Sequence, residues 1–272
     1  VNNWRWVVVI GAIGALFVWW LRLGLPESPR WLARVGRLAE AEAVVSDIET
    51  RIEAETGRLP PIGVAIAEEG KATFSEIWHS PYRGRAIMLS IFHFFQTFGY
   101  YGFAAWVPTL LIAKGITVTR SLEFAFIIAI ANPIGPLLGM LVADRMERKT
   151  QIVCSAIGIG VFGMLFSQQS TELGLIALGV LITLSNNWLS YSFHNYQAEV
   201  FPTRIRSRAI GFVYAWSRLS AALSGLAIAF FLGLGGTTAV FGFIAFAMLI
   251  VVVVIGGFGP RTRGLALEAI SG

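Results

Sequence analysis

The chain has 272 residues, of which 56% are hydrophobic and only 14% are charged. A soluble globular protein has about 25% charged residues, so this composition, with its long apolar runs, predicts an integral membrane protein. The net charge of +5 does not indicate nucleic-acid binding, because the basic residues fall in short loops between the apolar runs. The single cysteine, Cys154, excludes an internal disulfide and a cysteine cluster for a metal, and we expect no cofactor.

Seven stretches are long enough to cross a hydrocarbon core of about 30 Å, which requires roughly 20 residues of helix. We expect each to be an α-helix, because an open strand cannot satisfy its backbone hydrogen bonds in lipid. Tryptophans flank the first stretch and no small-residue cleavage site follows it, which favours a spanning helix over a signal peptide. The expected spans are residues 6–25, 86–113, 122–143, 151–167, 173–196, 209–234 and 237–258.

The only long polar segment is residues 26–85. Ser28 followed by Pro29 is typical of a helix start, and Gly57 is typical of a helix end. Apolar residues recur at helical spacing between them, which predicts amphipathic helices. These helices either lie on a membrane surface or form a solvated linker, and the sequence leaves both open.

Lysine and arginine predict the orientation of the spans, because cytoplasmic loops are enriched in them. They concentrate in the segment 26–85, in the loops after the third and fifth spans, and in the tail 260–272. The expected arrangement is therefore a transmembrane helix over 1–25, a cytoplasmic linker over 26–85, a six-helix transmembrane bundle over 86–259 and a cytoplasmic tail over 260–272. The N-terminus is expected outside.

Four cytoplasmic stretches resemble motifs of the major facilitator superfamily, and in particular of its sugar-porter-like members. Residues 26–32 (PESPRWL) resemble the motif after their sixth helix. Residues 144–149 (DRMERK), 199–206 (EVFPTRIR) and 260–264 (PRTRG) resemble the sequences after their eighth, tenth and twelfth helices. The resemblance implies an all-α integral membrane fold of seven transmembrane helices, which are the sixth helix and the C-terminal six-helix bundle of a twelve-helix transporter.

The chain departs from the family pattern in several places. Met140 and Glu147 stand where glycines are usual, and Arg261 stands where glutamate is usual. We expect these changes to loosen the cytoplasmic ion-pair network that the resemblance implies. The first five helices of the family have no counterpart here, so we expect about half of a substrate site, which needs an N-terminal half for transport.

One arginine, Arg218, interrupts the apolar stretch AIGFVYAWSRLSAALSGLAIAF. It lies about nine residues, or roughly 13 Å, inside the sixth span. A charge near the membrane centre costs roughly 2.5–3.5 kcal/mol, and no acidic residue occurs at that depth to offset it. Because a guanidinium fork suits a carboxylate, we expect Arg218 to bind a substrate anion. A structural or gating pair with the N-terminal half, and snorkelling to the interface, are the alternatives.

The stretch around Arg218 also resembles the eleventh helix of organic-anion and aromatic-acid carriers of the superfamily, which implies an anionic substrate. Further polar side chains share faces of the second and fifth spans, and one lies beside an expected proline kink at Pro133. With Arg218 they form the expected substrate-binding set, which is His93, Gln96, Tyr100, Asn132, Asn187, Tyr191 and His194. The alternative is hydrogen bonding between helices. The two histidines are also candidate proton carriers.

A second set of charges lies at the cytoplasmic ends of the spans. It comprises Asp144, Arg145, Arg148, Glu199 and Arg206. The resemblance implies a conformational latch that holds one state of an alternating-access cycle. The alternative is that these residues are solvated charges that only set the topology.

These observations predict the C-terminal part of a secondary active transporter in an inner (plasma) membrane. We expect it to move a small organic anion, such as an aromatic carboxylate, by alternating access with proton coupling. Its expected partners are the lipid bilayer, the N-terminal half, the small-molecule substrate and the proton. No acidic residue lies deep in any span, so the coupling carboxylate is expected in the N-terminal half.

A sugar or polyol symporter of the same superfamily is the alternative, supported by PESPRWL. Against it, the second span lacks the paired glutamines of sugar porters. A seven-helix receptor is disfavoured by the long segment 26–85 and by the absence of lysine in the last span. An enzyme is not expected, because the spans carry no paired carboxylates and the chain has no H-E-x-x-H motif.

Overall fold

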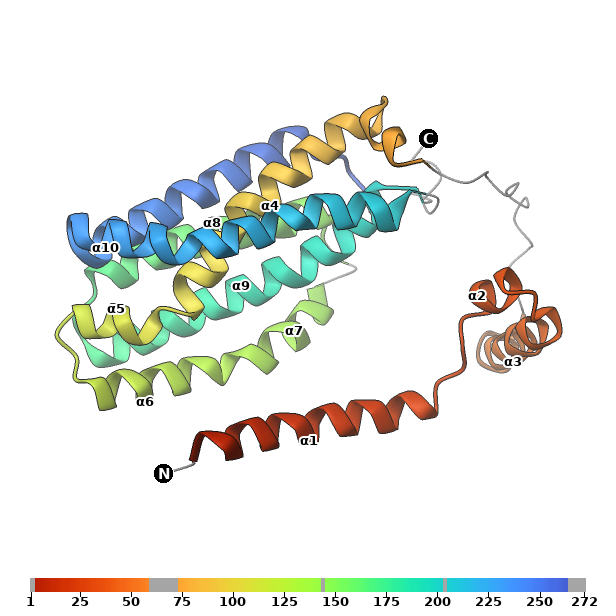
Figure 1. Cartoon of the computed structure of the whole chain (residues 1–272), viewed down its shortest axis with the longest axis horizontal. Helices are drawn as coiled ribbons and strands as arrows, with labels where there is room; N and C mark the ends of the chain where they lie inside the picture. The colour runs from red at the N-terminus through yellow and green to blue at the C-terminus, as the bar shows by residue number, and fades with distance from the viewer. Residues whose placement is uncertain (1–2, 59–72, 143–144, 203–204, 264–272) are drawn as a thin grey trace. The chain divides into compact units, whose positions relative to one another are not determined.

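The computed structural model describes residues 3–58, 73–142, 145–202 and 205–263. Every regular element in these ranges is a helix, which confirms the predicted all-α class. The chain divides into two compact units, Val1–Glu68 and Glu69–Gly272, and their helices are drawn in Figure 1. The expected part boundaries at residues 25, 85 and 259 stay predictions.

The first unit contains α1 (Asn3–Leu23), α2 (Pro29–Arg34) and α3 (Leu38–Thr56). Both predicted terminal signals are confirmed. Ser28 is the N-cap residue of α2, with Pro29 as its first helical residue, and Gly57 ends α3 with a φ of 82°. That left-handed conformation suits glycine, which has no Cβ to clash. Leu32 and Ala41 are buried where α2 packs on α3.

The second unit holds the remaining helices. They are the 3₁₀ helix η1 (Phe74–Trp78), α4 (Tyr82–Ala104), α5 (Val107–Ala113), α6 (Val118–Ala129), α7 (Ala131–Val142), α8 (Arg148–Gln168), α9 (Glu172–Val200) and α10 (Arg206–Phe258). The long helices run side by side as a bundle (Figure 1), in which α10 packs on α4 and α8, and α9 packs on α7 and α8.

Two of the expected spans are interrupted. The stretch 86–113 breaks at Ala105 and Trp106, between α4 and α5. The stretch 122–143 breaks at Ile130, between α6 and α7. Pro133 has no N–H to donate to the Ala129 carbonyl oxygen and its ring crowds that oxygen, so an interruption at the following residue, Ile130, is consistent with the kink predicted at Pro133. Residues next to both breaks line the smaller of the two pockets described below.

A reversal divides α10 into two antiparallel halves (Figure 1). Gly235 and Gly236 have non-helical backbone, with φ 63° and ψ −155° at Gly236. That region of backbone space is essentially reserved for glycine. The boundary predicted between the spans 209–234 and 237–258 is therefore confirmed.

Four helical stretches are long and apolar enough to cross a membrane, judged by length and composition in the described part of the chain. They are Val118–Gly139, Arg148–Gln168, Glu172–Val200 and Arg206–Phe258, the last of which is the folded-back α10. The apolar part of α1, Val8–Leu23, is shorter. Buried polar residues on α4, such as His93 and Gln96, reduce the apolar character of that helix. The count of seven spans stays a prediction.

Close approach of α7 to α9 depends on the glycine pair Gly135 and Gly139. A Cβ at Gly135 would lie 2.5 Å from the Cβ of Asn187, and one at Gly139 would lie 3.5 Å from the Tyr191 ring. Glycines spaced by four residues line one helix face and let another helix pack closely. Aromatic rings pack between α4, α8 and α10, where Phe166 lies 5.6 Å from Phe103 and 5.3 Å from Phe241, measured between ring centroids.

The turn between α5 and α6 is held to the end of α8 by one lysine. Lys114 Nζ donates hydrogen bonds to the carbonyl oxygens of Ser167 (2.7 Å) and Gln169 (2.9 Å). A cation at a helix C-terminus stabilises the free carbonyls there. Partial burial lowers the pKa of Lys114 from its ordinary value.

Candidate functional site

Polar side chains gather around a hollow between α4, α9 and α10. It has a volume of about 230 Å³. We call it the polar hollow, and the described residues that line it are Gln96, Thr97, Tyr100, Tyr101, Asn186, Ser190, Phe193, His194, Tyr214, Ser217 and Arg218. Of these lining residues none is aspartate or glutamate, so Arg218 is the one formal charge among them.

Tyr214 orients the guanidinium of Arg218. Arg218 NH2 donates a hydrogen bond of 2.7 Å to the Tyr214 hydroxyl oxygen, and its Cζ lies 4.8 Å from the centroid of the Tyr214 ring. The two residues are four apart on α10, so their side chains share one helix face. The hydrogen bond uses one of five N–H donors, and the remaining fork is left for a planar anion.

His93 lies behind Tyr214 and does not line the polar hollow. It is fully buried, and its Nε2 lies 2.9 Å from Gln197 Oε1. Its ring contacts those of Phe193 and Tyr214 at centroid distances of 5.3 and 5.2 Å. The structure thus places His93 where it supports Tyr214, and its expected substrate contact stays a prediction.

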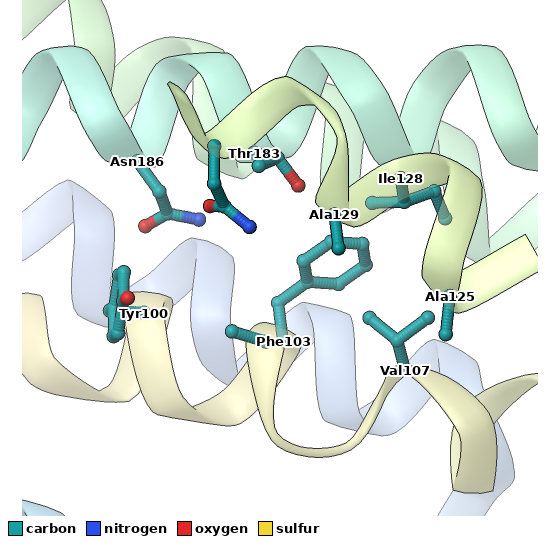
Figure 2. A pocket seen from close by; sticks show the side chains of 10 residues that line it. Tyr100, Phe103, Val107, Ala125, Ile128, Ala129, Thr183 and Asn186 are labelled. Atoms are coloured by element: carbon teal, nitrogen blue, oxygen red, sulfur yellow. The ribbon is translucent and has the colours of Figure 1, made fainter. Parts of the chain in front are cut away.

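A smaller pocket of about 70 Å³ adjoins the polar hollow, because Tyr100 and Asn186 line both. We call it the side pocket, and its described lining residues are Tyr100, Phe103, Ala104, Val107, Ala125, Ile128, Ala129, Asn132, Thr183 and Asn186. Figure 2 shows Tyr100 and Asn186 at one end and the apolar side chains of Val107, Ala125 and Ile128 at the other. The breaks between α4 and α5 and between α6 and α7 lie beside this pocket.

The structure brings together five of the eight expected substrate-binding residues. Gln96, Tyr100, His194 and Arg218 line the polar hollow, and Tyr100 and Asn132 line the side pocket. Gln96 is mostly buried, and its Nε2 donates a 3.0 Å hydrogen bond to Thr97 Oγ1. His194 stacks on Phe193 with ring centroids 4.1 Å apart. Their contact with a substrate stays a prediction.

Asn187 and Tyr191 face the interface with α7 instead. Asn187 Nδ2 donates to Asn132 Oδ1 (3.1 Å) and to the Thr183 carbonyl oxygen (3.0 Å). Neither Asn187 nor Tyr191 lines the polar hollow or the side pocket, and both pack on the glycines of α7. This arrangement corresponds to the alternative of hydrogen bonding between helices.

Sequence reasoning missed Asn186 and Ser190, which line the polar hollow from α9. With His194 they form a series spaced by four residues, which marks one face of a helix. The face chosen from the sequence began one residue later, at Asn187. Since successive residues on a helix are turned by about 100°, that offset points to the neighbouring helix rather than to the hollow.

The described latch residues lie at or near the ends of α8, α9 and α10. Arg148 Nε and Glu199 Oε1 are 3.4 Å apart, and their side chains are 18% and 25% exposed. Arg206 Nε donates a 3.2 Å hydrogen bond to the Phe201 carbonyl oxygen. Arg145 is exposed, and Asp144 lies outside the described residues. The role of this set as a latch stays a prediction.

The start of the tail is hydrogen-bonded to residues at the start of α8. The Glu147 carboxylate accepts hydrogen bonds from the backbone N–H groups of Thr262 (2.8 Å) and Arg263 (3.3 Å). Lys149 Nζ donates to the Gly259 carbonyl oxygen at 2.9 Å. Glu147 therefore adds a link between α8 and the tail, whereas we expected its presence to loosen this region.

The arrangement suits non-covalent binding of a small polar molecule. Within the described residues no group of three histidine, cysteine or carboxylate side chains is placed to hold a metal. The hollow offers one guanidinium, amides, phenols and hydroxyls, which recognise anions and hydroxyl groups.

Comparison with known proteins agrees with these features. The model of the "Sugar (and other) transporter" family matches residues 1–272. The chain is 30% identical to the inner membrane metabolite transport protein YdjE of Escherichia coli, over 99% of this chain and 61% of that protein. It is 26% identical to the niacin transporter NiaP of Acinetobacter baylyi, over 98% of this chain and 61% of that protein.

The fold resembles that of a solved transporter. The proton:xylose symporter XylE of the major facilitator superfamily, from E. coli, matches with a TM-score of 0.72 at 19% identity, over 100% of this chain and 60% of that chain. The chain thus spans about three fifths of the length of these relatives. The relatives are transport proteins, in agreement with the expectation that the chain is not an enzyme.

The apolar helices and the membrane relatives together identify a multi-pass integral membrane protein. Both the sequence motifs and the helical bundle point to one superfamily. The chain belongs to the sugar (and other) transporter family, and it has the fold of the major facilitator superfamily.

Proposed function

We propose that the chain is the C-terminal part of a secondary active transporter that moves a small organic anion by alternating access, with proton coupling. The observation that carries this proposal is the place of Arg218. Its guanidinium lines the polar hollow, whose described lining residues include no carboxylate to neutralise it. A carboxylate substrate supplies that negative charge.

The surroundings of Arg218 favour an anion over a cation. The Tyr214 hydroxyl and ring hold the guanidinium in place, which reduces the side-chain entropy lost on binding. Apolar helices around the hollow lower the local dielectric constant, so a charge-assisted pair there is stronger than one at a fully solvated protein surface. A cationic substrate in the same hollow would instead be repelled.

In this proposal the bundle acts together with a second helical bundle. The relatives are longer than this chain, and their additional length is sufficient for such a bundle. Substrate sites of such transporters lie between two halves that rock around a central site. The Arg148–Glu199 pair at the ends of α8 and α9 is then part of the latch that holds one state. A coupling carboxylate is expected outside the polar hollow, since none of its described lining residues is acidic, and His194 in its lining is the other candidate proton carrier.

We further propose that the linker 26–85 and the tail 260–272 face the cytoplasm and that the membrane is the inner (plasma) membrane. The arginines in these segments support this orientation. The parts 1–25 and 86–259 are then the sixth helix and the C-terminal bundle of the family.

A sugar or polyol is the second candidate substrate. Two observations favour it: the family model describes sugar transporters, and XylE binds a sugar derivative. The amides and hydroxyls of Gln96, Tyr100 and Asn186 suit the hydroxyl groups of such a substrate. This candidate leaves the charge of Arg218 without a partner.

Uptake by the intact protein that contains these 272 residues decides between the two. We would compare labelled carboxylates, hexoses, polyols and organic cations, with and without a pH gradient, in wild type, Arg218→Gln and the control Arg120→Gln. Arg120 is an exposed residue near the start of α6. We expect carboxylate uptake that Arg218→Gln lowers roughly ten- to a hundredfold, as expected for lost charge-assisted hydrogen bonds.

Arg120→Gln should leave uptake unchanged, and all variants should reach the membrane in equal amounts. Uptake of hexose or polyol that Arg218→Gln leaves intact would overturn the anion proposal in favour of the second candidate. Loss of uptake when the pH gradient is collapsed supports proton coupling, and unchanged uptake contradicts it.

A further inference from the structure

Asn186 lies at the junction of the polar hollow and the side pocket and has an unused hydrogen-bonding group. Its side chain is only 5% exposed, and its buried Oδ1 has no hydrogen-bond partner among the described residues. Leaving a buried amide oxygen unpaired costs about 1–3 kcal/mol. An unpaired group of this kind beside two cavities points to a ligand that completes it.

The neighbouring asparagine on the same helix differs from Asn186, because its side-chain amide is hydrogen-bonded. Asn187 donates to both Asn132 and Thr183, and it faces α7. Asn186 instead lines both pockets (Figure 2). The last torsion of an asparagine side chain is soft, so a small rotation turns either amide atom toward the hollow. A ligand hydroxyl both donates and accepts, and it therefore pairs with either atom.

The spacing along the helices places Asn186 away from the guanidinium but within reach of the same small molecule. Asn186 and His194 are eight residues apart on α9, a rise of about 12 Å. Tyr214 lies opposite the His194 end, where the two ring centroids are 6.1 Å apart, and Arg218 lies one turn further along α10. Arg218 and Asn186 both line the polar hollow, so a molecule that fills it contacts both.

The side pocket adds an apolar requirement next to Asn186. Phe103, Val107 and Ile128 line it together with Ala125 and Ala129. Its volume of about 70 Å³ exceeds the roughly 10–15 Å³ that one water needs. The end lined by Val107, Ala125 and Ile128 (Figure 2) has no polar side chain to hold water, whereas the polar lining residues lie toward Asn186. A compact hydrocarbon part of the ligand fits there better than a second charge or a fully hydroxylated chain.

We propose that the transported anion is a hydroxy acid with a compact apolar body. In this assignment, which rests on the proposed anion transport, its carboxylate pairs with Arg218, its hydroxyl pairs with Asn186, and its hydrocarbon part contacts the side pocket. Asn186 is then the residue that selects hydroxylated carboxylates over their plain analogues.

Competition against uptake of the best labelled carboxylate, in the intact protein, tests this assignment. The probes are pairs that differ by one hydroxyl, namely 4-hydroxycyclohexanecarboxylate with cyclohexanecarboxylate, and 4-hydroxybutanoate with butanoate. We expect the hydroxylated cyclic acid to compete roughly three- to tenfold better than its plain analogue in wild type, the gain of one hydrogen bond. Asn186→Leu should abolish this preference while plain acids still compete.

Two matched variants accompany the test. Asn195→Leu makes the same change on the same helix at a residue that lines neither pocket and whose amide donates to the Tyr191 carbonyl oxygen, and it should keep the preference. Ala129→Leu narrows the side pocket from α6. It should weaken competition by the cyclic acids several-fold more than competition by the butanoates.

The outcomes separate the two proposals. If no carboxylate competes, or if competition is independent of Arg218, the proposed function fails, and this inference fails with it. If carboxylates compete in an Arg218-dependent way but Asn186→Leu leaves the hydroxyl preference unchanged, only the assignment of Asn186 is overturned. A loss of folded protein in Asn186→Leu with unchanged selectivity identifies Asn186 as a packing residue and likewise overturns the assignment.

Discussion

A chain of contacts runs from the core of the bundle to the guanidinium of Arg218. Gln197 lies 2.9 Å from His93 Nε2, the His93 ring packs on the Tyr214 ring, and Tyr214 accepts a hydrogen bond from Arg218. A binding group is most effective when its orientation is set before the ligand arrives. If the proposed anion binds at Arg218, buried neighbours of Tyr214 are expected to contribute to its binding without touching it.

The Tyr214→Phe variant tests this positioning. It removes the hydrogen bond to Arg218 but keeps the aromatic ring and the cation–π contact, so the guanidinium is oriented less firmly. We expect the KM for carboxylate uptake to rise roughly three- to tenfold, as for one lost hydrogen bond, with little change in maximum rate. Tyr214→Leu removes the ring as well and should have the larger effect. An unchanged KM in both variants would contradict a positioning role.

At the scale of helices, the Arg148–Glu199 pair joins the start of α8 to the end of α9. Each charge has the sign that the dipole of its own helix disfavours at that end. Arg148 is the first residue of α8, and Glu199 is one residue from the end of α9. A helix N-terminus favours negative charge and a C-terminus favours positive charge. Each residue is therefore unfavourable toward its own helix, and the two charges offset each other across the interface.

This arrangement predicts that losing one charge of the pair and exchanging the two charges have different effects on the melting temperature of the detergent-purified intact protein. Glu199→Gln should lower the melting temperature, by an amount equivalent to about 1 kcal/mol, because Arg148 then faces the α8 dipole without its carboxylate. The charge swap Arg148→Glu with Glu199→Arg restores the pair and also matches both dipoles.

The swapped protein should melt at or above the wild-type temperature. Arg120→Gln, which removes the exposed contact with Glu172, should change the melting temperature less than Glu199→Gln does. If the swap is as unstable as Glu199→Gln, the pair does not link α8 to α9. If Glu199→Gln, which breaks the pair, leaves transport unchanged, the latch proposal is contradicted, because a latch must bias one conformational state.

At the scale of the whole molecule, the reversal in α10 decides whether a bundle forms. The two halves of α10 supply packing surfaces for α4 and α8, and the polar hollow is lined by its first half. Gly236 makes this reversal with a backbone conformation that residues with a Cβ avoid. The site therefore depends on a glycine that lies outside it.

The Gly236→Ala variant should lose folded protein. We expect a strain of about 1–3 kcal/mol in the turn, seen as a lower monodisperse fraction in size-exclusion chromatography and a lower melting temperature. Gly233→Ala is the matched control, because a Cβ there meets open space and the residue has no positive φ. Equal yields and melting temperatures for the two variants would show that the turn tolerates a Cβ.

Much of this architecture follows from local properties of the sequence. Apolar run length predicted helices and the boundary between residues 234 and 237, Gly57 predicted where a helix ends, and Pro133 predicted a kink. Each of these signals reflects the effect of a residue on its own backbone or its interaction with the surrounding solvent. No knowledge of the neighbouring helices is therefore needed. Arg218 was recognisable as a candidate for the same reason, since a charge in an apolar span is costly wherever it points.

Only the tertiary structure decided which polar residues share a cavity. It separated Asn186 from Asn187, placed His93 behind Tyr214, and turned Glu147 toward the tail. Each of these depends on the rotation and depth of one helix against another, and packing across the bundle sets both. Successive residues on a helix point in directions about 100° apart. A shift of one position is therefore enough to move a side chain from a cavity wall to an interface between helices.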